Sequence, residues 1–192
     1  MEREGIRLRK ICADDHEITA LAEINREAFP KEERAPLDGL LQTGAEIVGI
    51  FRSGMPCGFF ALRSYRKIRY LAFFAVRQDL RNQGIGREAL ALLKESCAGH
   101  ALVTECEAPY PKAESGDIRH RRKRFYLRSG FRETGWFNRY DGTEFEILCT
   151  GPFDHAEYAQ FTRYLSGLLE DPIPEPYQRS GENIAEKLTA RV

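Results

Sequence analysis

The sequence has little of what membrane, secreted or metal-binding proteins carry. No apolar run reaches the roughly 18 residues of a spanning helix, and no apolar segment follows the charged first residues, so we expect neither a membrane segment nor a secretory signal. The five cysteines are far apart and odd in number, with no Cys-x-x-Cys pair, which favours reduced thiols in the cytoplasm over a disulfide framework. The four histidines form no His-Glu-x-x-His pattern, and we therefore expect no metal site.

An excess of charge is also missing. The 29 basic residues balance the 29 acidic ones, so nucleic acid and anionic membranes are not expected as partners. The length of 192 residues suits one domain with a tail rather than two full domains. We expect a domain over residues 1–151, followed by a C-terminal helix and an extended tail over residues 152–192.

Hydrophobic periodicity predicts strands mixed with helices. Asp14 and Asp15 are the expected N-caps of the first helix. Ser53-Gly54 and Asp141-Gly142 predict tight turns between antiparallel strands. The expected strands cover residues 6–11, 46–51, 57–64, 69–76, 101–107, 131–139 and 143–150. The expected helices cover residues 18–28, 84–97, 117–129 and 153–169, and a shorter helix starts near Pro36. An extended link is expected over 171–176, followed by a short exposed helix at the C-terminal end. The fold class is therefore α/β (α+β), with a mixed, mostly antiparallel central sheet flanked by helices.

The richest stretch runs from Val76 to Arg87 and places Gly84 and Gly86 at the start of a predicted helix. Glycine lets a backbone approach a ligand closely, and the unpaired amides of a first helical turn favour an anion such as a diphosphate. The flanking arginines, Arg81 and Arg87, add positive charge there or are simply solvated.

Two alternatives compete for these glycines. They also fit Gly-x-Gly-x-x-Ala, a dinucleotide fingerprint, with Glu105 at the distance of a ribose contact. However, seven residues separate Val76 from Gly84, and an antiparallel meander precedes the loop, where that fingerprint expects a parallel βαβ array. The second alternative is a tight turn that binds nothing.

Further residues decide between these readings. The loop Arg81-Asn82-Gln83-Gly84-Ile85-Gly86 matches (Arg/Gln)-x-x-Gly-x-(Gly/Ala), and an apolar strand, Leu71 to Val76, precedes it. An acidic residue, Glu105, lies on the next strand, and Phe125 to Phe131 matches Phe-Tyr-x-x-x-Gly-Phe. In this order the motifs resemble the GNAT superfamily of N-acetyltransferases, over roughly Ile6 to Thr150. The resemblance implies a GNAT-like acyltransferase fold and acetyl-CoA (coenzyme A) as co-substrate.

The resemblance also implies where the coenzyme lies. Its diphosphate would rest on the amides around residues 83–87, and its pantetheine arm would pair with the strand edge over 73–76. Amides at 74–76 would hydrogen-bond the thioester oxygen. The implied coenzyme-binding residues are Phe74, Ala75, Val76, Arg81, Asn82, Gln83, Gly84, Ile85, Gly86 and Arg87.

By the same resemblance, Tyr126 is the general acid that protonates the departing sulfur, because its ordinary pKa near 10 keeps it protonated at neutral pH. Glu105 is the base that takes the amine proton, directly or through water, and Glu107 is its rival on the same strand face. The alternatives are a buried structural tyrosine and two solvated or acceptor-binding carboxylates. Where many relatives place an asparagine that contacts the pantetheine arm, this chain has Ala108-Pro109-Tyr110-Pro111.

Two remaining features have several interpretations. The basic run from Arg119 to Arg124 is favoured as a solvated helix face, with nucleic acid, the coenzyme's 3′-phosphate and an acidic acceptor as alternatives. The aromatic residues Trp136, Phe137 and Tyr140 belong to an acceptor pocket, an oligomer contact or the core.

The sequence thus predicts a cytoplasmic N-acetyltransferase that acts by direct transfer on a primary amine of a small molecule or peptide. The alternatives are a non-catalytic acyl-CoA-binding regulatory module and a dinucleotide-binding oxidoreductase. A homodimer, reached through the C-terminal helix and the link that follows it, is left open.

Overall fold

The computed structural model describes residues 5–97, 99–109 and 116–179. The expected helix at the C-terminal end, and Tyr110 and Pro111, lie outside the described residues. The chain divides into two compact units, residues 1–102 and 103–192, and each is described by itself. The domain boundary expected at 151/152 is a separate question and stays a prediction.

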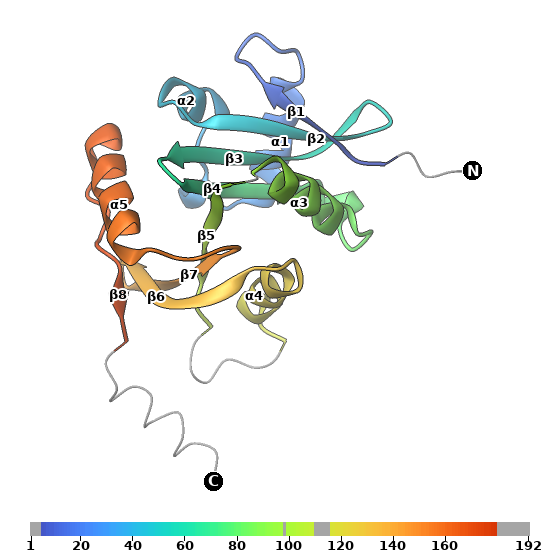
Figure 1. Cartoon of the computed structure of the whole chain (residues 1–192). Helices are drawn as coiled ribbons and strands as arrows, with labels where there is room; N and C mark the ends of the chain where they lie inside the picture. Colours follow the sequence, from blue (N-terminus) through green and yellow to red (C-terminus); the bar gives the residue numbers. More distant parts are fainter. Residues whose placement is uncertain (1–4, 98, 110–115, 180–192) are drawn as a thin grey trace. The chain divides into compact units, whose positions relative to one another are not determined.

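The first unit is built on four antiparallel strands: β1 (Arg7–Ile11), β2 (Glu46–Arg52), β3 (Met55–Tyr65) and β4 (Ile68–Val76). The predicted meander is confirmed (Figure 1). Ser53 and Gly54 have φ of 50° and 77°, as a two-residue hairpin turn with two left-handed positions requires. β4 pairs along β3 up to Val76 opposite Gly58, so the end of β4 lies beside the start of β3.

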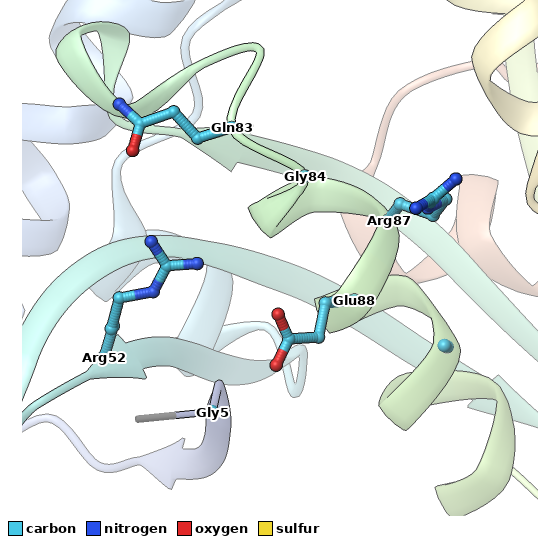
Figure 2. Close-up of a pocket in the computed structure, with 7 residues that line it drawn as sticks. Gly5, Arg52, Gln83, Gly84, Arg87 and Glu88 are labelled. Atoms are coloured by element: carbon cyan, nitrogen blue, oxygen red, sulfur yellow. The ribbon is translucent and has the colours of Figure 1, made fainter. Parts of the chain in front are cut away.

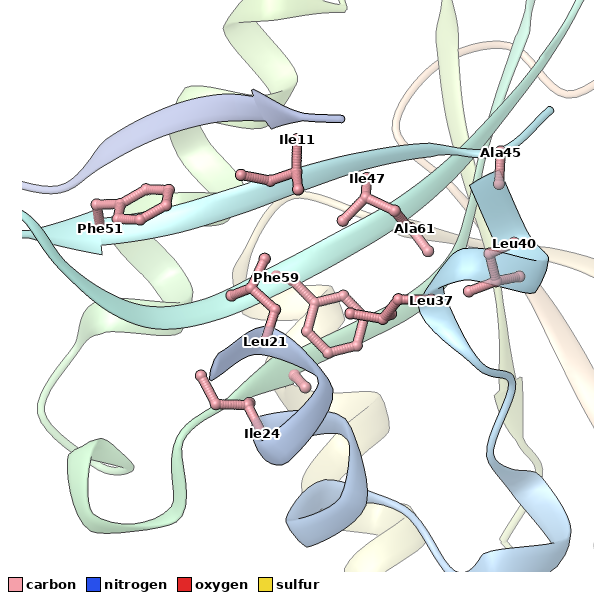
Figure 3. Packing of buried hydrophobic residues seen from close by; sticks show 11 residues of the cluster. Ile11, Leu21, Ile24, Leu37, Leu40, Ala45, Ile47, Phe51, Phe59 and Ala61 are labelled. Atoms are coloured by element: carbon pink, nitrogen blue, oxygen red, sulfur yellow. The ribbon is translucent and has the colours of Figure 1, made fainter. Parts of the chain in front are cut away.

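Three α-helices belong to this unit: α1 (Ile18–Ala28), α2 (Leu37–Gln42) and α3 (Ile85–Ser96). Short 3-10 turns, η1 (Lys31–Glu33) and η2 (Gln78–Leu80), follow α1 and β4. Figure 1 shows α3 in front of these strands and α1 behind them. The apolar stripe of α1 packs Leu21 and Ile24 into a buried cluster with Phe59 of β3, as Figure 3 shows.

One detail of α1 differs from the prediction. The expected N-caps, Asp14 and Asp15, are wrong, because the N-cap position is Glu17 and no side chain caps the helix. The Asp15 carboxylate instead accepts from the Cys12 amide at 2.8 Å and forms an ion pair with Arg9. The aspartate therefore stabilises the turn that precedes the helix.

The second unit contains β5 (Ala101–Glu107), α4 (Ile118–Arg128), β6 (Arg132–Tyr140), β7 (Thr143–Cys149), α5 (His155–Leu169) and β8 (Tyr177–Gln178). Its strands lie in the order β5-β7-β6-β8, and all three pairs are antiparallel. The predicted Asp141-Gly142 turn joins β6 to β7 with φ of 46° and 81°. Asp117 and Asp154 cap α4 and α5 by accepting backbone amide hydrogens of the first turn.

Together these elements confirm the predicted α/β class of antiparallel strands flanked by helices. The short strand β8 was not predicted. All five cysteine thiols are free. Among the described helices, none is both long and apolar enough to cross a lipid bilayer.

Candidate active site

The loop between β4 and α3 has a strained shape that its own side chains hold in place. Asn82 and Gly84 both have positive φ, 61° and 84°, and Gly84 is the N-cap of α3. The Arg81 Nε donates to the Val76 carbonyl at 3.1 Å, and the Gln83 Nε2 donates to the Asp79 carbonyl at 3.0 Å. The arginine of the motif therefore ties the loop to the end of β4, a role that its sequence position alone did not indicate.

The loop leaves the start of α3 open. The first intrahelical bond is made by the Glu88 amide, which donates to the Gly84 carbonyl at 3.1 Å. Within the part of the chain that the structure describes, the amides of Ile85, Gly86 and Arg87 have no hydrogen-bond acceptor. These three donors, at the positive end of the helix dipole, suit an anion.

A cavity of about 570 Å³ lies beside this helix start. Figure 2 shows Arg52, at the end of β2, and Glu88, on α3, on facing sides of it, with Gln83 and Gly84 at one end. Glu88 also accepts from the Ile6 amide at 2.8 Å, which ties α3 to the start of β1. Arg87 also lines the cavity, and its side chain extends away from Arg52 and Glu88 in Figure 2. A Cβ placed on Gly84 would meet no atom within 4 Å, so the helix entrance opens on free space. The open amides and the nearby arginines fit a diphosphate.

The side chains at the end of β4 pack within this unit. Ala75 is buried, and the Phe74 ring packs on the Phe60 ring with centroids 4.6 Å apart. On the neighbouring strand a Cβ at Gly58 would lie 2.2 Å from the Ala75 carbonyl oxygen. Glycine at this position is therefore what lets β3 and β4 run this close together.

In the second unit, the Phe-Tyr-x-x-x-Gly-Phe segment forms the C-terminal end of α4 and the residues that terminate this helix. Gly130 ends the helix with φ of 90°, and the Phe131 amide donates back to the Tyr126 carbonyl at 3.1 Å. The Phe131 and Tyr126 rings then meet edge to face, with centroids 5.3 Å apart. The motif thus fixes the tyrosine in one orientation.

The phenol of Tyr126 is buried against β5. The side chain is 8 % exposed, and its hydroxyl hydrogen-bonds with the side chain of Thr104. Burial raises the pKa of Tyr126 to about 12. The hydroxyl therefore keeps its proton at neutral pH, as a general acid must.

Glu105 is the next residue of β5, and alternation along a strand places its side chain on the opposite face from Thr104. Its Oε1 accepts from the Tyr158 hydroxyl at 2.8 Å, from the Tyr140 hydroxyl at 3.1 Å and from the Asn138 Nδ2. Sequence reasoning had grouped Tyr140 with the aromatic residues but missed Asn138 and Tyr158. Asn138 and Tyr140 are two apart on β6 and so share a face, whereas no local signal identifies Tyr158 on a distant helix.

Glu107, the alternative candidate for the base, forms an ion pair with a residue of α4. Its Oε1 accepts from the Arg119 Nε at 2.6 Å, and Arg119 also binds Asp117, the N-cap of α4. In the same basic run, Lys123 binds Glu146 and Glu133. The neighbouring arginines Arg121, Arg122 and Arg124 are exposed. Part of the basic run therefore stabilises α4, and the exposed part faces solvent.

The three aromatic residues singled out in the sequence, Trp136, Phe137 and Tyr140, have different surroundings. Phe137 is buried under the Arg179 guanidinium, Trp136 stacks on His155 with centroids 4.4 Å apart, and Tyr140 donates to Glu105. Among the described residues, no group of three His, Cys, Asp or Glu side chains is arranged to hold a metal ion.

The first unit thus has an antiparallel meander, a glycine loop and a helix whose first amides are open. The sequence profile of the acetyltransferase (GNAT) family matches residues 13–131, more than half of the chain. The chain therefore belongs to the GNAT family, and it is an acetyl-CoA-dependent N-acetyltransferase.

Solved structures agree with this fold. A GNAT-family acetyltransferase from Bacteroides thetaiotaomicron has a TM-score of 0.70 and 24% identity, covering 88% of this chain and 99% of its own. A GNAT acetyltransferase from Elizabethkingia anophelis, solved with acetyl-CoA bound, has a TM-score of 0.55 and 18% identity over 78% of this chain and 100% of its own. The ribosomal-protein-S18-alanine N-acetyltransferase from Escherichia coli has a TM-score of 0.56 and 18% identity, covering 75% and 92%. No curated protein matches the sequence significantly.

Proposed function

We propose that this protein transfers an acetyl group from acetyl-CoA directly to a primary amine of a small molecule or peptide in the cytoplasm, without a metal ion. The observation that carries the proposal is the set of three amides without acceptors at the start of α3. Bound there, acetyl-CoA supplies an activated thioester carbon. The amides of Ile85, Gly86 and Arg87 would hold its diphosphate, and Arg81 and Gln83 keep the loop in the shape that exposes them.

Two side chains account for the protons. The new bond joins the amine nitrogen to the acetyl carbon, while the bond from that carbon to sulfur breaks. The amine must lose one proton, which Glu105 accepts directly or through water, and the sulfur must gain one, which Tyr126 supplies. Burial raises the pKa of Tyr126 to about 12, so its hydroxyl carries a proton at neutral pH. The ion pair with Arg119 makes Glu107 the poorer candidate for the base.

The same residues weigh against the alternatives. Four antiparallel strands precede the glycine loop, whereas a dinucleotide fingerprint opens a parallel βαβ array. Turnover of acetyl-CoA with an amine separates the proposed function from a non-catalytic module. A homodimer stays a prediction.

Ligand-dependent stability tests the coenzyme site. At about 100 times its Kd, acetyl-CoA stabilises the folded protein by roughly 2.7 kcal/mol and raises the Tm, while NAD at the same concentration leaves the Tm unchanged. Release of free thiol from acetyl-CoA, followed over a panel of small amines and peptides, then tests turnover. An equal shift with NAD, or a coenzyme shift without thiol release on any amine, contradicts the proposal.

A further inference from the structure

Three side chains from two elements converge on one carboxylate oxygen. Asn138 and Tyr140 reach the Oε1 of Glu105 from β6, and Tyr158 reaches it from α5. Tyr158 is 1 % exposed and Asn138 is 0 % exposed, so neither polar group can use water instead. A carboxylate that accepts several hydrogen bonds is stabilised in its ionised form. The arrangement therefore favours a fixed negative charge at Glu105.

The arrangement is poorly explained by stability alone. The Asn138 Oδ1 is buried and accepts no hydrogen bond from the residues that the structure describes. A buried amide that satisfies only its donor side costs stability, and such groups call for another explanation. Burial, followed by the charge of Glu105, raises the pKa of Tyr140, so its hydroxyl stays a donor. The buried Asn138 Oδ1 and the protonated Tyr140 hydroxyl are both explained if the role of Asn138 and Tyr140 is to hold the Glu105 carboxylate.

One of the three donors lies outside the family match. That match ends at residue 131, whereas Tyr158 lies in α5. The helix N-cap, Asp154, accepts from the amides of Ala156 and Glu157 and fixes the turn that begins the helix. The Tyr158 ring also packs on Phe153 and Phe161, with centroids 5.4 Å and 5.7 Å away. The hydroxyl is thus presented by a rigid element.

We propose that Asn138, Tyr140 and Tyr158 are positioning residues for Glu105, which they hold ionised and in one orientation so that it receives the proton that the attacking amine loses. This inference rests on the proposed acetyl transfer. It makes α5 part of the catalytic machinery.

The elements packed around Glu105 contribute both charged and neutral groups. On β5 itself, Glu107 is paired with Arg119 of α4. On β7, the residues opposite Glu105 and Glu107 are Ile147 and Phe145, which carry no charge. Tyr140 of β6 and Tyr158 of α5 are titratable groups in contact with the carboxylate. Removal of either hydroxyl therefore changes a direct contact of Glu105.

The test removes one hydroxyl at a time. Tyr158→Phe keeps the ring and loses the donor, so the acidic limb of kcat/KM against pH moves upward by about one pH unit, and kcat at neutral pH falls more than KM rises. The same amine is used for both proteins, so its own ionisation cancels. Tyr164→Phe is the matched control, because Tyr164 lies on the same helix with 49 % exposure; its profile stays that of the wild type.

A titration that does not depend on turnover tests the positioning of Glu105 separately from the proposed acetyl transfer. The Glu105 carboxyl carbon, followed by ¹³C NMR, titrates about one pH unit higher in Tyr158→Phe than in the wild type. A lower Tm with unchanged NMR titration and pH profile overturns the positioning role and leaves acetyl transfer standing. If Glu105→Gln keeps full turnover, the base assignment fails, and with it the positioning role. If no amine is acetylated while the titration moves, the proposed function fails instead.

Discussion

The hydroxyl of Tyr126 is one atom on which the proposed chemistry depends. Tyr126→Phe keeps the ring contact with Phe131 and removes only the acid, so we expect kcat to fall by about 10²–10⁴-fold with coenzyme affinity nearly unchanged. The lost hydrogen bond with Thr104 lowers the free energy of unfolding by about 1 kcal/mol. Single-turnover kinetics measure the first effect and urea unfolding the second. An unchanged kcat while chemistry limits the rate contradicts the assignment.

The same residue also predicts an alkaline effect on stability. Burial raises the pKa of Tyr126 to about 12 in the folded protein, from an ordinary value of 10. Below pH 10 the phenol is protonated in both states and its contribution is fully present. Between pH 10 and 12 the unfolded state loses the proton first, so that contribution falls by up to about 1.4 kcal/mol per pH unit. The free energies of unfolding of the wild type and Tyr126→Phe, measured with urea, should therefore become more similar as the pH rises above 10. A difference that stays constant contradicts the raised pKa.

Single residues also show what sequence can and cannot reveal. Gly84 and Tyr126 were predicted because each lies in a contiguous motif whose local conformation explains it. Asn138 and Tyr158 lie 33 and 53 residues from Glu105, and only the pairing of β5, β7 and β6 and the docking of α5 bring them to it. Contacts of that kind depend on tertiary structure, which periodicity does not encode.

At the scale of elements, the close approach of β3 and β4 depends on Gly58. Gly58→Ala places a methyl group 2.2 Å from the Ala75 carbonyl, a backbone atom that cannot swing aside, so the end of β4 must shift. We expect a loss of about 1–3 kcal/mol in the free energy of unfolding and a weaker affinity for acetyl-CoA. Gly167→Ala is the control, since that α5 glycine is exposed with open space around it and should gain about 0.5–1 kcal/mol. Urea unfolding measures the stability of both variants, and calorimetric titration measures their affinity for acetyl-CoA. If Gly58→Ala changes neither quantity, β3 and β4 do not need glycine at this position.

The two-residue strand β8 pairs with β6, and the Glu144 carboxylate binds Tyr177 in this strand and Arg179 just after it. Glu144 accepts from the Tyr177 hydroxyl at 2.7 Å and from the Arg179 Nε at 3.0 Å. Burial opposes the ionisation of Glu144, but hydrogen bonds from Arg179 and Tyr177 outweigh it and hold the pKa of the carboxyl below its ordinary 4.5. Stability from this group is therefore present above about pH 4.5 and lost as the pH falls through the folded-state pKa.

Glu144→Gln should remove that acid dependence and cost about 1–3 kcal/mol at neutral pH, because Arg179 keeps a partly buried charge. Amide hydrogen exchange at Tyr177 and Gln178 should accelerate. In the control, Glu175→Gln, the exposed pair with Arg163 is lost, and stability should change by less than about 0.5 kcal/mol. Equal exchange rates in the two variants would mean that Glu144 does not hold β8.

The elements themselves were largely predictable because each carries its own pattern. The β2–β3 and β6–β7 hairpins follow from Ser53-Gly54 and Asp141-Gly142, whose φ values are positive as such turns demand. The strand β8 escaped prediction because two residues cannot show alternation, and its partners, the strand β6 and Glu144 of β7, lie more than 30 residues away in the sequence. The start of α1 was misjudged because Asp15 turns back to the Cys12 amide rather than forward to the helix.

At the scale of the whole molecule, the predicted domain boundary at 151/152 places α5 outside the folded domain. In the structure, however, α5 buries Tyr158 and Phe161 to 1 % exposure each, with Thr162 and Leu165 also buried. Loss of one such aromatic side chain costs about 3–5 kcal/mol, against a total stability of about 5–15 kcal/mol for a typical domain.

A chain that ends at residue 151 should therefore lose cooperative folding in residues 103–151, and its Glu105 would lack the Tyr158 donor. A chain that ends at Arg179 keeps every contact described for α5 and β8 and should unfold at the same urea concentration as the full chain. Circular dichroism during urea unfolding distinguishes the two, and thiol release from acetyl-CoA shows whether activity follows folding. If the 151-residue chain unfolds at the wild-type urea midpoint and keeps full turnover, then α5 is dispensable, and the catalytic unit ends where the sequence predicted.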